Sequence, residues 1–162
     1  MDLLHENGGN LDDAIKLKKD QVLFVEGESS AYLYIVVRGK IRIVKELESK
    51  FIPISVVGEK SFIGELSMFS DDVRSASAIA METTSVLMIK KSDIRKVLKS
   101  CPDWVSEIMQ TLSGRLRGGL DILREHNIVD GASDSENNLS PQESKSITAS
   151  LKAYRKRRGL NS

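Results

Sequence analysis

The chain has 162 residues, 40% of them hydrophobic, which suits one compact domain with an additional tail. We expect no membrane span, because no apolar run approaches the roughly 20 residues that a span needs. We also expect no secretory signal, because no basic segment precedes an apolar one at the N-terminus. Cys101 is the only cysteine, so an internal disulfide is excluded. These features favour a cytoplasmic protein, and the net charge of +1 argues against a general attraction to nucleic acid.

Residues from about 11 to 90 carry the pattern of a β protein. Short apolar runs alternate with polar residues, and Gly39 separates two of them, where its tolerance of positive φ favours a tight hairpin. Many short strands separated by such turns predict a sandwich, roll or barrel. The expected strands include residues 22–25, 32–37, 41–44, 52–57 and 84–89.

The pattern changes at Ser92, a candidate N-cap followed by apolar residues at helical spacing. Pro102 then opens a second, longer helix, which we expect Gly118-Gly119 to interrupt. An apolar stripe on this helix fits packing against the domain, and it also fits a homodimer interface, so both interpretations stay open. The stripe consists of Val105, Ile108, Leu112 and Leu116.

The end of the chain divides into a polar and a basic segment, after an expected globular domain over residues 1–128. Residues 129–146 predict a linker, because they bury too little surface to offset the entropy lost on ordering. Residues 147–162 contain five basic side chains and no acidic one. Three interpretations of this basic tail stay open: a solvated end, a helix that docks on a partner or back on the domain, and a contact with nucleic acid or an anionic membrane.

The segment 62–77 carries the residues most typical of a binding site. Gly64-Glu65-Leu66 indicates the start of a short helix, whose free N–H groups and partial positive charge suit a phosphate. Arg74 adds a planar fork of donors for phosphate, and Glu65 can accept a hydrogen bond from a sugar hydroxyl. The small residues Ser75-Ala76 leave room beside the backbone. Together they predict a pocket for a ribose with an anionic phosphate, the alternative being a plain ion pair between Glu65 and Arg74.

Gly-Glu-Leu followed about ten residues later by Arg-Ser resembles the phosphate-binding cassette of cyclic-nucleotide-binding domains. This family includes the bacterial catabolite activator protein and the regulatory subunits of protein kinase A. The resemblance covers roughly residues 17–117. Residues 24–28 are similar to the family's first glycine turn, 34–41 to its second hairpin, and 88–93 to the start of its B helix.

The resemblance implies a mainly β fold, an eight-stranded, jelly-roll-like β-roll (a double-stranded β-helix) followed by the B and C helices. It implies that Glu65 takes the ribose 2′-hydroxyl and that Arg74 takes the cyclic phosphate. The other residues expected at the ligand are Gly64, Leu66, Ser75 and Ala76. The implied ligand is cyclic AMP or cyclic GMP, with cyclic AMP favoured.

Two positions depart from the family's pattern. Lys60 stands where the family usually has a glycine, and a positive φ there would cost about 1 kcal/mol. Gly118-Gly119 stands where some relatives place a Thr or Ser that contacts the base. Arg115 and Arg117 are therefore the candidates for base contacts, because a guanidinium can lie over a purine face.

The sequence thus predicts a non-enzymatic sensor that binds a cyclic purine mononucleotide and passes the signal to a protein partner through its C-terminal helices. The alternatives are a ligand-free interaction module and a truncated effector domain of a transcription regulator. We expect no enzyme activity and no metal site, because no nucleophile, general base or metal ligands converge. We expect no sequence-specific DNA binding, because no helix-turn-helix pattern follows the long helix.

Overall fold

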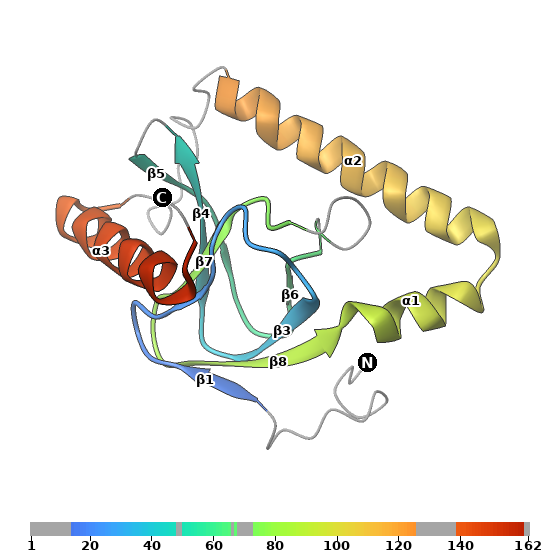
Figure 1. Cartoon of the computed structure of the whole chain (residues 1–162), viewed down its shortest axis with the longest axis horizontal. Helices are drawn as coiled ribbons and strands as arrows, with labels where there is room; N and C mark the ends of the chain where they lie inside the picture. The colour runs from blue at the N-terminus through green and yellow to red at the C-terminus, as the bar shows by residue number, and fades with distance from the viewer. Residues whose placement is uncertain (1–13, 48–49, 66, 68–72, 126–138, 161–162) are drawn as a thin grey trace.

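The computed structural model of the chain describes residues 14–47, 50–65, 67, 73–125 and 139–160. Within these residues the chain forms eight β-strands followed by three α-helices (Figure 1). The strands are β1 (Ile15–Leu17), β2 (Val22–Phe24), β3 (Tyr32–Arg38), β4 (Ile41–Leu47), β5 (Lys50–Val57), β6 (Phe62–Ile63), β7 (Ser77–Ala80) and β8 (Thr84–Lys90). The helices are α1 (Lys91–Lys99), α2 (Asp103–Glu125) and α3 (Pro141–Arg158).

The strands form two four-stranded sheets whose neighbouring strands are all antiparallel. The first sheet has the order β1-β8-β3-β6 and the second has the order β2-β7-β4-β5. Strands that follow one another in sequence therefore often lie in different sheets. The chain passes from β3 to β4 at Gly39, whose φ is 90°. The expected hairpin at Gly39 is wrong, because β3 and β4 lie in different sheets and do not pair, although Gly39 has the positive φ that was expected of it. The eight-stranded β-roll with helices after it, as the resemblance implied, is confirmed.

The second sheet is apolar on both of its faces. Side chains of a strand alternate between the two faces, so Ala78 and Ala80 of β7 join the core between the sheets while Ile79 joins a cluster outside. All four residues of β7 are buried, which requires a cover on each face. The core between the sheets consists of Leu17, Leu23, Phe24, Tyr34, Val36, Ile41, Ile63, Ala78, Ala80 and Val86.

Helix α3 supplies the cover on the outer face of the second sheet, while α1 and α2 extend from another part of the roll (Figure 1). Its buried residues Ile147, Leu151 and Tyr154 recur at spacings of four and three, which places them on one side of a helix. They pack against Val22, Val25, Val44, Phe51 and Ile79 of the roll. A helix from the far end of the chain is therefore part of the folded domain.

Helix α3 begins inside the segment that the sequence indicated as a linker. Ser140 and Glu143 form a capping box, in which each side chain accepts a hydrogen bond from the other residue's backbone N–H. Residues 141–146 are thus helical. Of the three interpretations of the basic tail, the structure has the helix that docks back on the domain. The division into domain, linker and tail stays a prediction, since residues 126–138 lie outside the described residues.

Helix α2 continues through Gly118 and Gly119 to Glu125, whereas we expected the glycine pair to interrupt it. Each glycine costs only about 1 kcal/mol relative to alanine in a helix interior. The neighbouring leucines and arginines are good helix formers, so the pair does not end the helix. None of the described helices is both long and apolar enough to cross a membrane.

Leu151→Ala is expected to lower the free energy of unfolding by about 2–5 kcal/mol, because it opens a cavity between α3 and the second sheet. Leu151 is 0% exposed. Lys152→Ala is the control, because Lys152 is exposed on the same helix and its loss should change stability by less than about 0.5 kcal/mol. Urea unfolding followed by circular dichroism measures both values. Equally small effects would show that α3 does not pack on the roll in solution.

Candidate ligand-binding site

A cavity of about 630 Å³ lies between the roll and the second half of α2. This volume is typical of sites for small molecules. The roll contributes apolar side chains from β2, β4, β5 and β6. The α2 side is lined by Arg115, Leu116, Gly119 and Ile122. The polar side is lined by Lys45, Gly64, Glu65, Ser67, Arg74 and Ser75, with Ala76 beside them.

Gly64 follows the short strand β6 and has a φ of 90°, a conformation that side chains other than glycine's rarely adopt. There is a second reason for glycine at this position. A Cβ built on residue 64 would collide with Nη1 of Arg74. The guanidinium therefore lies directly against the backbone of the Gly64 segment, which only a residue without a side chain permits.

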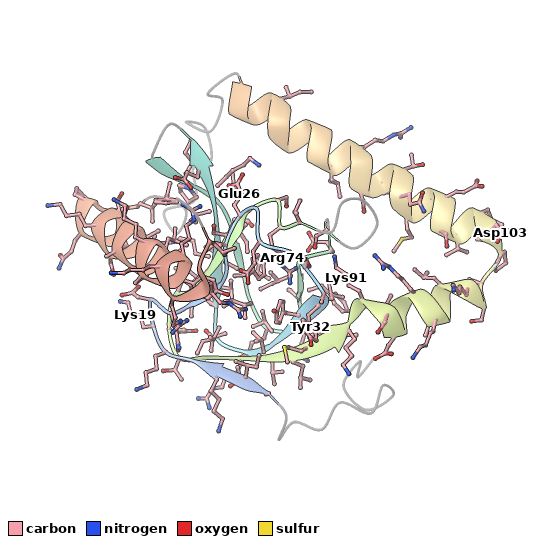
Figure 2. All side chains as sticks on the ribbon, in the orientation of Figure 1. Lys19, Glu26, Tyr32, Arg74, Lys91 and Asp103 are labelled. Atoms are coloured by element: carbon pink, nitrogen blue, oxygen red, sulfur yellow. The ribbon has the colours of Figure 1, made fainter. Side chains whose placement is uncertain are left out.

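The Arg74 side chain crosses the interior of the roll, in the region where Figure 2 also labels Tyr32 and Lys91. Arg74 is only 4% exposed. Its Nη2 donates to the carbonyl of Tyr32 at 2.8 Å, and its Nη1 donates to Ser67 Oγ at 3.4 Å. Its Cζ lies 4.0 Å from the centroid of the Phe24 ring and 5.2 Å from that of Tyr34. Two aromatic rings thus lie close to the guanidinium.

Among the described residues, the hydrogen bonds of this buried cation go to neutral groups, and the carboxylate of Glu28 favours its charge only from a distance. Burial lowers the pKa of Arg74 from its ordinary value, while Tyr34 beside it acts in the opposite direction. An arginine nevertheless keeps its charge in proteins. Within the described part of the chain, Nε of Arg74 is buried and has no hydrogen-bond partner. A buried charge of this kind is stabilised by an anion, and the cavity in front of it is where an anion can enter.

The segment after Gly64 is tied to the helices by Ser67, a residue that sequence reasoning did not single out. The Ser67 hydroxyl lies 2.9 Å from the carbonyl oxygen of Gly64 and 3.0 Å from Oγ of Ser30. Lys91, the first residue of α1, is buried and donates from Nζ to the carbonyl of Ser67. The start of α1 therefore contacts the same segment that contacts Arg74. No short motif marks these two residues in the sequence.

Lys45 of β4 is another cation on the cavity wall, and sequence reasoning missed it too. Its Nζ donates to the carbonyl of Ser75 at 2.9 Å and lies 3.3 Å from Oε1 of Glu26. The side chain is only 10% exposed. Lys45 therefore holds the backbone immediately after Arg74. Alternation along β4 would have placed Lys45 on the inner face with Ile43. The sequence did not indicate that its partners there are the Ser75 carbonyl and Glu26.

The structure brings most of the predicted site residues to this one cavity. Its lining includes Gly64, Glu65, Arg74, Ser75, Ala76 and Arg115. Leu66 and the side chain of Arg117 lie outside the described residues. Glu65 is exposed whereas Arg74 is buried, and the described contacts of Arg74 do not include Glu65. The alternative of a plain ion pair between them therefore has no support in the structure.

Lys60, the first departure from the family's pattern, has a φ of 63°. It thus adopts the left-handed conformation that a glycine would adopt more easily. The residue is exposed, and its N–H donates to the carbonyl of Val36 at 2.8 Å. The strain of about 1 kcal/mol is therefore local to a surface turn.

The roll and the Gly64–Arg74 contact agree with comparisons of the sequence to known families. The profile of the cyclic nucleotide-binding domain matches residues 14–101. The chain belongs to the cyclic nucleotide-binding domain family. The match covers all eight strands and α1, so the cassette lies inside the matched region.

Among individual proteins, the chain is similar to the cyclic AMP receptor protein of Thermus thermophilus, with 29% identity over 96 residues, 59% of this chain and 44% of that protein. It is 24% identical to the CRP-like cAMP-activated global transcriptional regulator of Mycobacterium tuberculosis over 104 residues, 64% of this chain and 46% of that protein. The chain thus spans less than half the length of these relatives.

Among solved structures, the EAL enzyme Bd1971 is similar in its cAMP-bound and its cGMP-bound forms. Each superposes with a TM-score of 0.61 and 28% identity, over 72% of this chain and 32% of that chain. The likeness therefore concerns one domain of a larger protein. It extends beyond the matched strands, since 72% of this chain is more than residues 14–101 alone.

Gly64→Ala is expected to destabilise the domain by more than Gly27→Ala does, as measured by urea unfolding. Both residues have positive φ, so both variants carry backbone strain of about 1–3 kcal/mol. A Cβ meets nothing within 4 Å at Gly27, whereas at Gly64 it collides with Arg74. The difference between the variants therefore isolates the contact with the guanidinium. Equal losses of stability would mean that Arg74 does not lie against residue 64.

Proposed function

We propose that this domain is a non-enzymatic sensor that binds a cyclic purine mononucleotide in the 630 Å³ cavity. The observation that carries the proposal is the buried guanidinium of Arg74, which faces the cavity beside Gly64 with its Nε without a partner among the described residues. A cyclic phosphate supplies the missing anion. The relatives that bind cyclic AMP, and the similar structure with cyclic AMP or cyclic GMP bound, support the same ligand class.

The proposed roles follow the polar side of the cavity. Arg74 binds the cyclic phosphate, and Glu65, which is exposed at the cavity, accepts from the ribose 2′-hydroxyl. Gly64, Leu66 and Ser75 supply backbone or hydroxyl donors, and Ala76 leaves room beside them. Arg115 of α2, on the cavity wall, is the candidate to lie over the base, and Arg117 is the alternative. Because stacking discriminates poorly between purines, cyclic AMP is favoured over cyclic GMP only modestly.

Arg74→Ala is expected to weaken binding by about 2–5 kcal/mol, because it removes one partner of a buried charged hydrogen bond. Glu65→Ala should cost less, about 0.5–1.5 kcal/mol, because it loses a bond to a neutral hydroxyl. Arg38→Ala, which removes an exposed arginine at the end of β3, is the control. Calorimetric titration with cyclic AMP and with cyclic GMP measures all three variants.

Chromatography of the titrated samples should return intact cyclic nucleotide, since the proposal includes no reaction. Linear nucleotide formed by catalytic amounts of protein would contradict it. Near-wild-type affinity of Arg74→Ala would place the phosphate elsewhere. No binding of either nucleotide by the wild type would favour a ligand-free interaction module instead.

We further propose that the domain forms a homodimer through α2 and passes its signal to a protein partner through the C-terminal helices. Large apolar side chains on one side of α2 are exposed in the single chain, including Trp104 at 60%, Ile108 at 49% and Leu112 at 49%. Their spacing of four residues forms one continuous stripe. A stripe of this size on a helix is stabilised when a second copy covers it.

Leu112→Glu is therefore expected to convert the dimer to a monomer, since it places a charge in the centre of the apolar interface. Gln110→Glu introduces the same side chain on the opposite side of α2, where it is exposed and should leave the dimer intact. Light scattering coupled to size-exclusion chromatography measures the mass of each variant. A monomeric wild type at micromolar concentrations would contradict the dimer.

A further inference from the structure

We propose that Tyr154, Arg155 and Arg158 of α3 are positioning residues of the nucleotide site, so that docking of α3 and binding of the nucleotide strengthen each other. The inference rests on the proposed function of the cavity. It starts from two series of contacts that lead from α3, on the outer face of the second sheet, to the backbone of Arg74 and of Ser75.

The first series of contacts begins at the carboxylate of Glu28. The hydroxyl of Tyr154 lies 3.2 Å from each oxygen of this carboxylate, and Arg158 Nη2 lies 3.2 Å from Oε1. Arg158 also donates from Nε to the Tyr154 hydroxyl at 3.3 Å. Glu28 Oε2 in turn accepts from the N–H of Val25 at 3.1 Å. Two side chains of α3 thus hold the turn between β2 and β3 closed.

That turn is hydrogen-bonded to the residue that faces the phosphate. The N–H of Arg74 donates to the carbonyl of Glu28 at 2.9 Å, and the N–H of Gly27 donates to the carbonyl of Arg74 at 2.9 Å. Ser29 and Val73 form a β-bridge next to these bonds. The backbone from which the Arg74 side chain projects is therefore fixed by the same turn that Tyr154 and Arg158 hold.

The second series of contacts consists of buried and half-buried charged side chains. Arg155 Nη2 lies 2.6 Å from Glu46 Oε2, with the arginine side chain 14% exposed. The N–H of Glu46 donates to Glu26 Oε2 at 3.0 Å, and Glu26 Oε1 lies 3.3 Å from Lys45 Nζ. Lys45 then donates to the carbonyl of Ser75 on the cavity wall. This second series ends at Ser75, the residue next to Arg74.

Both series hold the backbone of residues 74 and 75, the first through the Glu28 turn and the second through Lys45 on the cavity wall. A side chain that binds a ligand does so best when its own position is locked by surrounding contacts. Without α3 the Glu28 turn and the Lys45–Glu26 pair lose these contacts, and the nucleotide must then order them on binding. By thermodynamic linkage, a helix that raises nucleotide affinity must be held more tightly when the nucleotide is bound.

The test compares two double variants of α3 in the full chain. Tyr154→Phe with Arg155→Gln removes the contact of the Tyr154 hydroxyl with Glu28 and that of Arg155 with Glu46, and it keeps the buried ring. Lys152→Gln with Lys156→Gln is the matched control, because both lysines are exposed on the same helix. We expect the first variant to bind cyclic AMP about 10-fold more weakly by calorimetry, within the 5- to 150-fold range of coupled sites. The control should bind like the wild type.

The reciprocal measurement is hydrogen exchange of the α3 amides. Saturating cyclic AMP should slow their exchange in the wild type by the same factor of about 10, and less in the Tyr154→Phe/Arg155→Gln variant. A purely structural role would lower the stability of α3 without making its exchange depend on the nucleotide. The single variant Arg155→Lys, which keeps the charge beside Glu46, should bind cyclic AMP nearly as tightly as the wild type. If the double variant does not fold, Tyr154→Phe alone decides.

Two results would overturn the inference and separate it from the proposed function. If the wild type binds cyclic AMP but the double variant binds it equally well, α3 does not position the site and the proposed function stands. If α3 exchange is the same with and without cyclic AMP, the coupling is absent although binding is present. If the wild type binds no cyclic nucleotide at all, the proposed function and the inference fall together.

Discussion

The burial of one positive charge constrains the rest of the roll. Arg74 lies inside the roll, with its guanidinium over Phe24 and beside Tyr34. A charge removed from water in this way is costly unless polar groups surround it. The carbonyl of Tyr32 and the hydroxyl of Ser67 meet part of this need. An anion in the cavity would meet the remaining need, and this supports the proposal that the cavity is a binding site.

The second sheet needs α3 because both of its faces are apolar. Its inner face carries the aromatic and small residues that surround Arg74 and the cavity, while its outer face carries Val22, Val44 and Ile79. One sheet therefore has to be covered on two sides. The polar contacts at the edge of the α3 interface involve Glu28 and Glu46, which lie beside the segments that hold residues 74 and 75. Packing and binding thus share one layer of backbone.

The roll and the cassette were predictable from the sequence because their signals are local. Short apolar runs indicate the strands, and Gly64 and Arg74 stand at a fixed spacing within one segment. The pairing of the strands was not predictable, because Gly39 indicated a hairpin between β3 and β4, which lie in different sheets. Helix α3 was not predictable in the same way. Its buried stripe has only three residues, and the partners of its charged side chains lie in strands near the other end of the chain. Because most residues of this helix are polar or charged, its composition indicates a linker and a tail. The Ser140–Glu143 capping box was nevertheless a local sign of its start.

The polar residues that complete the site were unpredictable for a related reason. Ser67, Lys91 and Lys45 act through backbone carbonyls, and any residue type offers a carbonyl. The side chains that Lys45 and Ser67 also contact, Glu26 and Ser30, lie far from them in the sequence, so no local motif could have indicated these residues. The family's motif therefore locates the groups proposed to face the ligand, whereas the groups that hold those in place emerge only from the fold.

Lys60 and Gly64 show how a glycine in a family pattern is to be weighed. Both residues have positive φ, yet one position has a lysine here. Lys60 lies exposed in a turn, where its side chain has space and the strain is about 1 kcal/mol. At Gly64 a side chain would also have to displace the guanidinium of Arg74. The first glycine of the pattern serves conformation, for which other contacts can compensate. The second serves close approach to a buried guanidinium, which a side chain at residue 64 would have to displace, so Gly64 together with Arg74 is the stronger evidence for the site.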